Sequence, residues 1–236
     1  ASYTWNDTKD NISFNGDVAN TSTLVLPVKD DPRDLSVITY SDNQFRSKVV
    51  FYATSPTIKG FVLGVRYSGI GGTRYTLRSG VNSNADFVTT NDLAYIFDIN
   101  NPNTPEAIRS GLQAILDNPE ASQSIKDYIL EYQGRIAERN GGINGFYGIW
   151  DVRLVKKISF GKSKTHGVEL SADLFNAANA INKKLGASKN LGTQDIYGNR
   201  GFDAANRQFN YAVNTAGVAT PAGNPWQLQI GVKYVF

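Results

Sequence analysis

The last eleven residues of the chain alternate between large apolar and mostly polar side chains with a period of two. The apolar positions are Trp226, Leu228, Ile230, Val232, Tyr234 and Phe236. A period of two indicates a β-strand whose two faces contact different surroundings. Chain ends usually fray, so a strand of such regularity at the last residue is unusual for a soluble protein. The medium that its apolar face contacts is therefore the first question that the sequence raises.

Four further segments repeat this pattern, and residues 1–6 read as the end of another strand. They are residues 45–53, 60–69, 146–160 and 166–176. The chain has 12 Tyr, 12 Phe, 3 Trp and 22 Gly, which favours strands joined by many turns. It has no apolar run of about 18 residues, the length of a membrane-spanning helix. We therefore expect an all-β fold of about six antiparallel strands.

The ionisable residues of these segments lie almost entirely on the polar faces. They are Arg46, Lys48, Arg66, Asp151, Arg153, Lys157, Glu169, Asp173 and Lys233. Only Lys156 and His166 fall on apolar faces, and both are near a strand end, where a long side chain can reach water. A cation on the lipid face of a membrane barrel costs about 2–4 kcal/mol at mid-depth. In a membrane, the apolar faces of the strands must therefore be the ones that contact lipid. The same pattern also allows an alternative, a soluble β-sandwich with buried apolar faces.

The spacing of the strands separates these two interpretations. Residues 55–59 and 161–165 form short links, whereas residues 7–44, 69–145 and 178–225 form long ones. Short and long links alternate, so all the short ones fall at one end of the sheet. Membrane β-barrels have short periplasmic turns and long extracellular loops, and compact sandwiches rarely hold three such long loops. The pattern predicts an antiparallel transmembrane β-barrel in the bacterial outer membrane, with the C-terminus on the periplasmic side.

Six strands are too few for a membrane barrel, because the smallest have eight. An open sheet edge in lipid would leave backbone groups unpaired at several kcal/mol each. The chain also has no Met and no signal peptide. We therefore expect residues 1–236 to be the C-terminal part of a larger barrel, whose other strands come from elsewhere.

The strand segments also resemble a known family. The ordered set SYTWND, FRSKVVFYA, GVRYSGIGGTRYT, FYGIWDVRLVKKI, VELSADLFNAAN and a final aromatic-ended strand is similar to the last six strands of TonB-dependent outer-membrane receptors, specifically the Oar-like receptors of Bacteroidota. The most specific element is LFNAAN in the penultimate strand. The ending Tyr234-x-Phe236 is similar to the assembly signal that the barrel-insertion machinery reads. By this resemblance, the last strand carries the assembly signal and also forms part of the barrel wall.

The resemblance implies a 22-stranded barrel with an N-terminal plug and energised import of a large or scarce substrate, such as a glycan, a peptide or a siderophore-like compound. The implied partners are outer-membrane lipid, the N-terminal barrel strands and plug, the TonB system acting through that plug, and the barrel-assembly machinery. A lipoprotein lid is a further partner that the sequence leaves open. The alternative function is a receptor-like barrel that serves as a structural or secretion-associated component of an outer-membrane complex.

The long loop of residues 69–145 has a helical pattern. Thr104 is expected to cap a helix near 105–117 that begins at Pro105, and a second helix is expected near 121–138. The apolar stripes of the two helices predict a helical hairpin. It would either form a lid over the barrel mouth or simply bury its two stripes against each other.

The last long loop combines aromatic residues with Asn and Gln. We expect ligand contacts at Tyr197, Arg200, Phe202 and Tyr211, in a surface suited to sugars or peptides. The same composition describes loops that only pack on one another. In the barrel interior, the polar-face charges either pair across strands or line a path for an anionic substrate.

Other functional classes have weak support in the sequence. Asp30, Asp31 and Asp34 could bind Ca²⁺, but their spacing matches no known calcium loop, and a solvated turn is the preferred interpretation. His166 is the single His, no Cys is present, and no nucleophile motif occurs. We therefore expect no enzyme activity, no catalytic or metal site and no cofactor. The formal charge of +3 also gives no reason to expect a nucleic-acid partner.

Overall fold

The computed structural model describes residues 1–13, 26–27, 35–161 and 166–236. Its main element is one antiparallel sheet of six strands, arranged in the same order as in the chain. The strands are β1 (Ser2–Trp5), β4 (Ser47–Thr54), β5 (Phe61–Gly71), β11 (Tyr147–Phe160), β12 (His166–Phe175) and β16 (Gln227–Val235). These are the six segments that the sequence analysis expects as strands, so the prediction of about six antiparallel strands is confirmed, and the described chain is mostly sheet.

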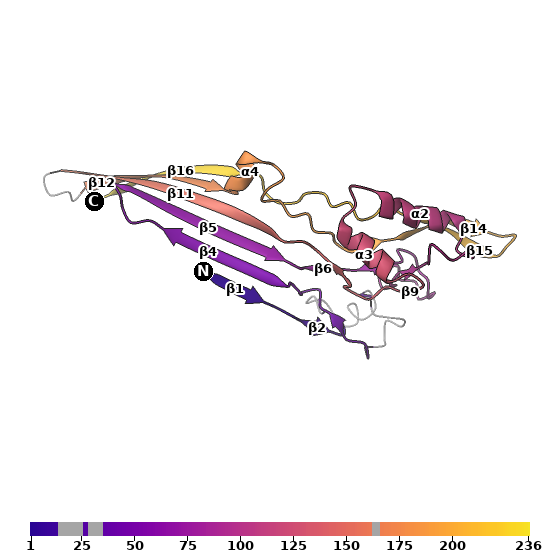
Figure 1. Ribbon diagram of the computed structural model, residues 1–236. Helices are drawn as coiled ribbons and strands as arrows, with labels where there is room; N and C mark the ends of the chain where they lie inside the picture. The colour runs from indigo at the N-terminus through magenta and orange to yellow at the C-terminus, as the bar shows by residue number, and fades with distance from the viewer. Residues whose placement is uncertain (14–25, 28–34, 162–165) are drawn as a thin grey trace.

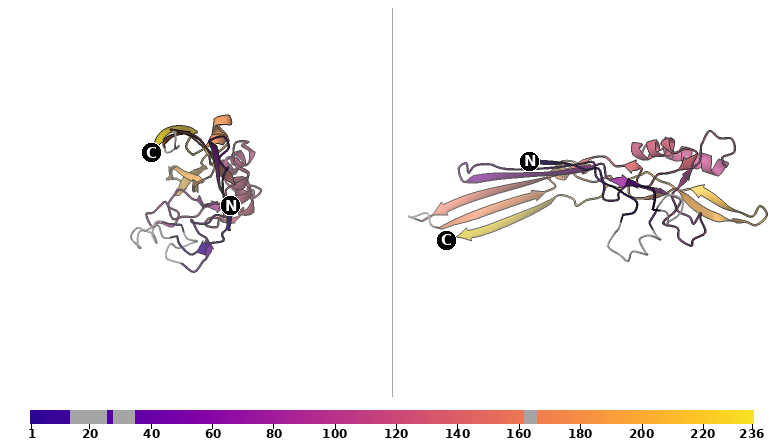
Figure 2. Two further views of the ribbon diagram at one scale, coloured as in Figure 1. Left: turned by 90° about the vertical axis from the view of Figure 1, so that its left-hand side faces the viewer. Right: turned by 90° about the horizontal axis from the view of Figure 1, so that it is seen from below.

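Each strand pairs with its neighbour along the chain, and β1 and β16 form the two edges of the sheet. Within the described residues the sheet is open, and it is curved when seen along its strands (Figure 2). The end of β4 and the start of β5 lie at the same end of the sheet as the end of β11 and the start of β12, and the described parts of the long links extend from the other end into a separate lobe (Figure 1). The chain therefore divides into a sheet and a lobe of loops.

The lobe has its own secondary structure, most of it in short pieces. Its strands are β2 (Lys9–Asp10), β3 (Thr39–Tyr40), β6 (Arg74–Tyr75), β7 (Leu77–Arg78), β8 (Tyr95–Ile96), β9 (Arg135–Ile136), β10 (Gly142–Ile143), β13 (Gln194–Asp195), β14 (Tyr197–Asp203) and β15 (Gln208–Val213). Among the described residues the lobe has the helices α2 (Glu106–Asp117) and α3 (Gln123–Glu131), and a short helix α4 (Ala177–Ile181) follows β12 at the rim of the sheet.

The hydrophobic core of the chain lies in this lobe and not between two sheets. Ile108, Leu112 and Ile115 of α2 and Ile125 and Ile129 of α3 are buried together with residues of the short strands. Residues as far apart in the chain as Tyr75 and Ala216 contribute to this one cluster, as in a small folded domain. The two helical stripes therefore bury against a shared core that the strands help to build, and not only against each other.

Two details of the predicted helices are wrong. Pro105, and not Thr104, is the N-cap of α2, and the Thr104 hydroxyl instead donates to the carbonyl of Asp98 at 2.7 Å. The second helix ends at Glu131 and does not continue to residue 138, because Gly134 has a φ of +77° and turns the chain into β9. The apolar side chain of Ile136 continued the helical spacing in the sequence, but it lies on a strand paired with β8.

Candidate functional site

One face of the sheet exposes a continuous band of apolar side chains. Leu63, Leu154, Leu170, Leu228 and Ile230 come from four strands and are 41–74% exposed. In a soluble sheet these positions would be covered, because each buried side chain of this size contributes about 1.5–3 kcal/mol. No part of the lobe core covers them. Contiguous apolar surface of this kind marks a face that meets a membrane or another protein.

Aromatic rings border this band at both ends of the strands. Near the lobe, Phe51, Tyr67 and Trp150 lie in one row across β4, β5 and β11, with the rings of Tyr67 and Trp150 4.5 Å apart. Gly148 makes room for this packing, because a Cβ there would lie 2.2 Å from the Tyr67 hydroxyl oxygen. Trp226, just before β16, adds an exposed ring near the same end.

The second aromatic row contains the proposed assembly signal. Phe160, His166 and Tyr234 have ring centroids 6.0–6.5 Å apart, and Tyr234 stacks on Phe236 at 6.0 Å. The Tyr234 hydroxyl hydrogen-bonds to Nδ1 of His166 at 2.9 Å. Phe236 is 91% exposed, so its ring is available to another molecule. His166 is therefore part of an aromatic cluster on the apolar face.

The opposite face of the sheet carries the charged residues, and several of them pair across strands. Arg66 lies 3.6 Å from Asp151, Arg153 lies 3.5 Å from Asp173, and Lys157 lies 3.6 Å from Glu169. Each pair joins directly opposed residues of the ladder. Arg66 and Arg153 are 63% and 61% exposed, so each pair contributes at most about 1 kcal/mol. The pairing interpretation of these residues is the one that the geometry supports.

The remaining predicted polar-face residues fit the same facing. Lys233 of β16 is directly opposite Glu169 of β12, and Lys48 of β4 is opposite Ile70 of β5. Arg46 lies just before β4, where its amide donates to the carbonyl of Gly71 at 2.9 Å. A shallow groove of about 210 Å³ runs along this face beside Arg66, Asp151 and Arg153.

The lobe contains a pocket of about 670 Å³. Its walls include Tyr95 of β8 and Phe97 directly after it, Pro105 and Ile108 at the start of α2, and the hairpin of β14 and β15. Pockets of this size with aromatic walls and a few polar groups are typical of small-ligand sites. Ser79, Ser83, Gln208 and Asn210 supply the polar groups, together with the guanidinium group of Arg200.

Three of the four predicted loop contacts line this pocket. Arg200 and Tyr211 contribute accessible side chains, whereas Tyr197 is only 6% exposed and its hydroxyl donates to the carbonyl of Tyr95 at 2.6 Å. Burial raises the pKa of Tyr197 above its ordinary value, so the phenol stays protonated. Phe202 is not among the pocket residues, and its ring packs against Phe209 at 5.1 Å.

Sequence reasoning missed the half of the pocket that comes from the long loop of residues 69–145. The rings of Tyr95 and Phe97 pack edge-to-face at 5.0 Å, and Phe97 contacts Tyr197 at 6.1 Å. The signal in the sequence was the alternation of Tyr95 and Phe97 with Ile96, which is buried. That alternation is too short to distinguish a pocket wall from an isolated strand.

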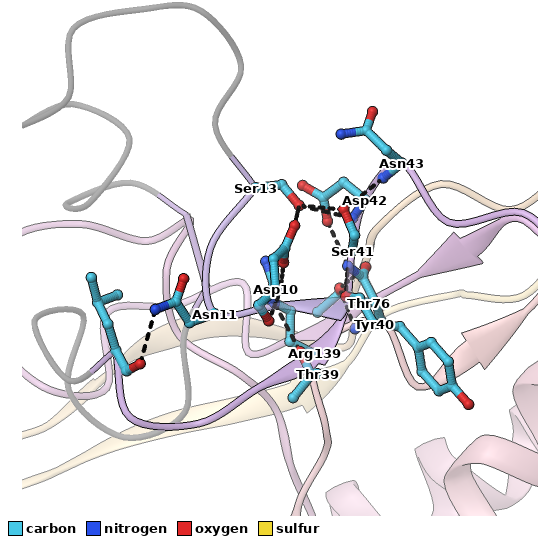
Figure 3. A network of polar contacts seen from close by, with 12 residues as sticks. Asp10, Asn11, Ser13, Thr39, Tyr40, Ser41, Asp42, Asn43, Thr76 and Arg139 are labelled. Atoms are coloured by element: carbon cyan, nitrogen blue, oxygen red, sulfur yellow. Dashed lines mark hydrogen bonds and ion pairs between the residues drawn. The ribbon is translucent and has the colours of Figure 1, made fainter. Parts of the chain in front are cut away.

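A buried polar network joins β2 and β3, which come from the first long link, to the rest of the lobe (Figure 3). Arg139 is 3% exposed; its guanidinium group binds the carboxylate of Asp10 and donates to the hydroxyl of Thr39 at 3.0 Å. Asn140 donates to the carbonyl of Tyr40 at 2.8 Å and accepts from the hydroxyl of Thr76 at 2.9 Å. The bonds from Arg139 to Thr39 and from Asn140 to Tyr40 each join residues 100 positions apart, so the network fixes β2 and β3 against the rest of the lobe.

Burial alone would raise the pKa of Asp10. Hydrogen bonds from Ser41, Arg139 and Ser13 outweigh that effect, and the pKa lies below its ordinary value. The carboxylate is therefore held in its charged form, as an ion pair with a buried guanidinium group requires.

Among residues 1–13, 26–27, 35–161 and 166–236, no three His, Asp or Glu side chains gather as metal ligands. The candidate calcium ligands Asp30, Asp31 and Asp34 lie outside the described residues. No helix in the described parts of the chain has the length and apolar character needed to cross a membrane. Comparison with known protein families, characterised proteins and solved structures finds no match to this chain.

Proposed function

We propose that the chain forms the C-terminal section of a TonB-dependent receptor barrel in the bacterial outer membrane. The six-stranded sheet would be part of a 22-stranded wall, and the lobe would face the outside of the cell. In this function the receptor imports a scarce or large substrate with energy passed on by TonB. The remaining wall strands and the plug would come from residues beyond this chain.

The exposed apolar band between two aromatic rows carries this proposal. Ten residues separate Trp150 from Phe160 along β11. At about 3.3 Å per residue and a strand tilt of about 40°, the two rows would be about 25 Å apart along the membrane normal. This is the height of the apolar band of outer-membrane barrels, which aromatic girdles flank on both sides.

The edges and the polar face support the same function. β1 and β16 each lack a neighbour on one side within the described residues, and unpaired backbone groups in lipid cost several kcal/mol each. Further strands on both edges would remove that cost. The Arg66–Asp151 and Arg153–Asp173 pairs would then face the lumen, where they hold the strands in register.

The pocket in the lobe is the proposed substrate contact of this section. Tyr95, Phe97 and Tyr211 offer ring faces to a sugar ring or a peptide side chain. Arg200, whose guanidinium group donates to Oδ1 of Asn214 at 3.4 Å, offers a cation to an anionic group. α2 and the hairpin of β14 and β15, whose residues line this pocket, lie away from the sheet (Figure 1). A substrate would therefore meet the lobe before it reaches the barrel mouth.

Membrane fractionation of cells that make the complete receptor tests this function. The receptor is expected in the outer-membrane fraction and to migrate differently on a gel before and after heating, as closed barrels do. Uptake of labelled glycans or peptides is expected to stop when the proton gradient is collapsed. Recovery of the protein as a soluble monomer without detergent would contradict the barrel, and gradient-independent uptake would contradict energised import.

A further inference from the structure

A second pocket lies on the apolar side of the sheet, at the end nearest the lobe. It has a volume of about 460 Å³ and is separate from the pocket of β14 and β15. Tyr67 and Trp150 form its floor, and Leu185, Lys184 and Lys189 line its rim. The pocket thus combines the upper aromatic row of the apolar face with two cations.

The chain between β12 and β13 is held in place to form this pocket. Asn176 has a φ of +51° and turns the chain out of β12, and its amide donates to the carboxylate of Asp151 at 2.9 Å. Its side-chain nitrogen donates to the carbonyls of Gly186 at 3.0 Å and Asn224 at 2.8 Å. Asn176 therefore fixes the segment that carries Lys184 and Lys189 beside the sheet.

The charge of this segment is one-sided. Residues 174–194 contain Lys183, Lys184 and Lys189 and no Asp or Glu. Among the described residues, no ion pair involves any of the three. Ile181 is 87% exposed and Leu185 is 48% exposed beside them. Apolar side chains next to cations are the composition of a surface that lies at a membrane interface.

We propose that this rim pocket binds a phosphorylated lipid of the outer leaflet. The lipid phosphate would sit between Lys184 and Lys189, where ammonium groups form strong charge-assisted hydrogen bonds with phosphate oxygens. The first carbons of an acyl chain would lie on Tyr67 and Trp150 and continue down the apolar band. This site rests on the proposed function, because it requires that the apolar face meets lipid.

The charge of the rim and the apolar floor together select this ligand class. A neutral lipid would leave the two ammonium groups without a counter-charge, and a free phosphate ion would leave the floor of Tyr67 and Trp150 exposed to water. A phosphorylated lipid satisfies both parts of the pocket. Binding there would hold the loop of residues 177–190 against the membrane surface.

The complete receptor in phosphatidylcholine nanodiscs doped with lipid A provides the test. Native mass spectrometry would count the lipid A molecules that remain bound after the surrounding lipid is removed. Each lysine near an anionic surface contributes about fivefold to affinity, so Lys184→Gln/Lys189→Gln is expected to weaken retention about 25-fold. Lys9→Gln/Lys126→Gln, which removes the same charge from the lobe, is expected to leave retention unchanged.

The results of this experiment distinguish failure of the lipid site from failure of the proposed membrane function. Equal retention in the wild type and in the Lys184→Gln/Lys189→Gln variant, with both inserted in the disc, would overturn the lipid site and leave the barrel intact. Failure to insert in a disc would overturn both. Phosphorus NMR in detergent with inorganic phosphate alone covers the other source of the ligand. Saturable phosphate binding that also displaces lipid A would show an anion site and overturn the lipid assignment.

Discussion

The rings of Tyr67 and Trp150 lie 4.5 Å apart on directly paired residues of β5 and β11. They belong to the same face as Leu63 and Leu154, which are likewise directly paired nearer the short links. An aromatic row therefore adjoins an aliphatic band at a fixed level of the sheet. A bilayer interface favours aromatic side chains and a bilayer interior favours aliphatic ones, so both rows match the order expected along a membrane-spanning strand.

A matched pair of substitutions on β11 tests the two faces. Leu154→Lys places a cation in the apolar band, and Val155→Lys places one at the next residue, on the opposite face. We expect Leu154→Lys to lower the free energy of unfolding in lipid vesicles by about 2–4 kcal/mol, because lipid cannot hydrate the charge. Val155→Lys is expected to stay within about 1 kcal/mol of the wild type. Equal effects of both substitutions in a urea titration would contradict the facing.

The ion pair of Arg139 with Asp10 is expected to stabilise the lobe. Arg139→Met leaves the carboxylate without its buried partner, and we expect the opening free energy of nearby amides to fall by about 3 kcal/mol. Hydrogen exchange of lobe peptides would measure this. Arg135→Met is the control, since Arg135 is 58% exposed and its loss should cost less than about 1 kcal/mol. Indistinguishable exchange in the two variants would show that the network does not anchor the first loop.

Acid is expected to weaken the same network. The folded pKa of Asp10 lies below its ordinary value of 3.8, so the unfolded chain binds its proton first as the pH falls. The stabilisation is therefore complete above that ordinary value and is lost as the pH falls through the lower folded value. The protection factors of amides near β2 and β3, which correct for the pH dependence of intrinsic exchange, should therefore fall in the wild type as the pH drops below about 4. Asp10→Asn should show a flatter response, and an equally steep one would assign the acid sensitivity to another group.

Gly111 of α2 is expected to set the position of the pocket hairpin. A Cβ at Gly111 would lie 2.5 Å from Cβ of Val213 on β15, so Gly111→Ala forces the helix and the hairpin apart. Helix propensity alone would favour Ala by about 1 kcal/mol, whereas overpacking costs about 1–3 kcal/mol. We expect net destabilisation of about 1 kcal/mol, seen as faster exchange in β14 and β15. Ser110→Ala, on the exposed side of the same helix, should not accelerate it.

The sheet could be predicted from the sequence because its signal is repeated along six strands. Each strand alternates independently, and opposed pairs such as Arg153 and Asp173 follow once the charged faces are aligned. The start of α2 was within one residue of its prediction, and the α3 prediction failed only at its end. In both regions a local pattern of several residues carries the information.

The lobe could not be predicted because its decisive contacts are not local. Arg139 and Asp10 are 129 residues apart, and no pattern in either segment identifies the other. Its eight described strands before β14 are only two residues long, which is too short for any period to appear. From the composition of the last loop the sequence predicts only Tyr197, Arg200 and Tyr211 among the residues that line the pocket. Tyr95 and Phe97 join them only through packing of the lobe core.

The most direct test of the central claim is a nitroxide scan along β11 in a lipid bilayer. The chain has no Cys, so single cysteines can be introduced and labelled one at a time from residue 150 to residue 158. The account predicts that even-numbered positions are accessible to oxygen dissolved in the bilayer, and odd-numbered positions to a water-soluble nickel complex. Access of the nickel complex to both sets, or protection of both sets from oxygen, would contradict a wall between lipid and water.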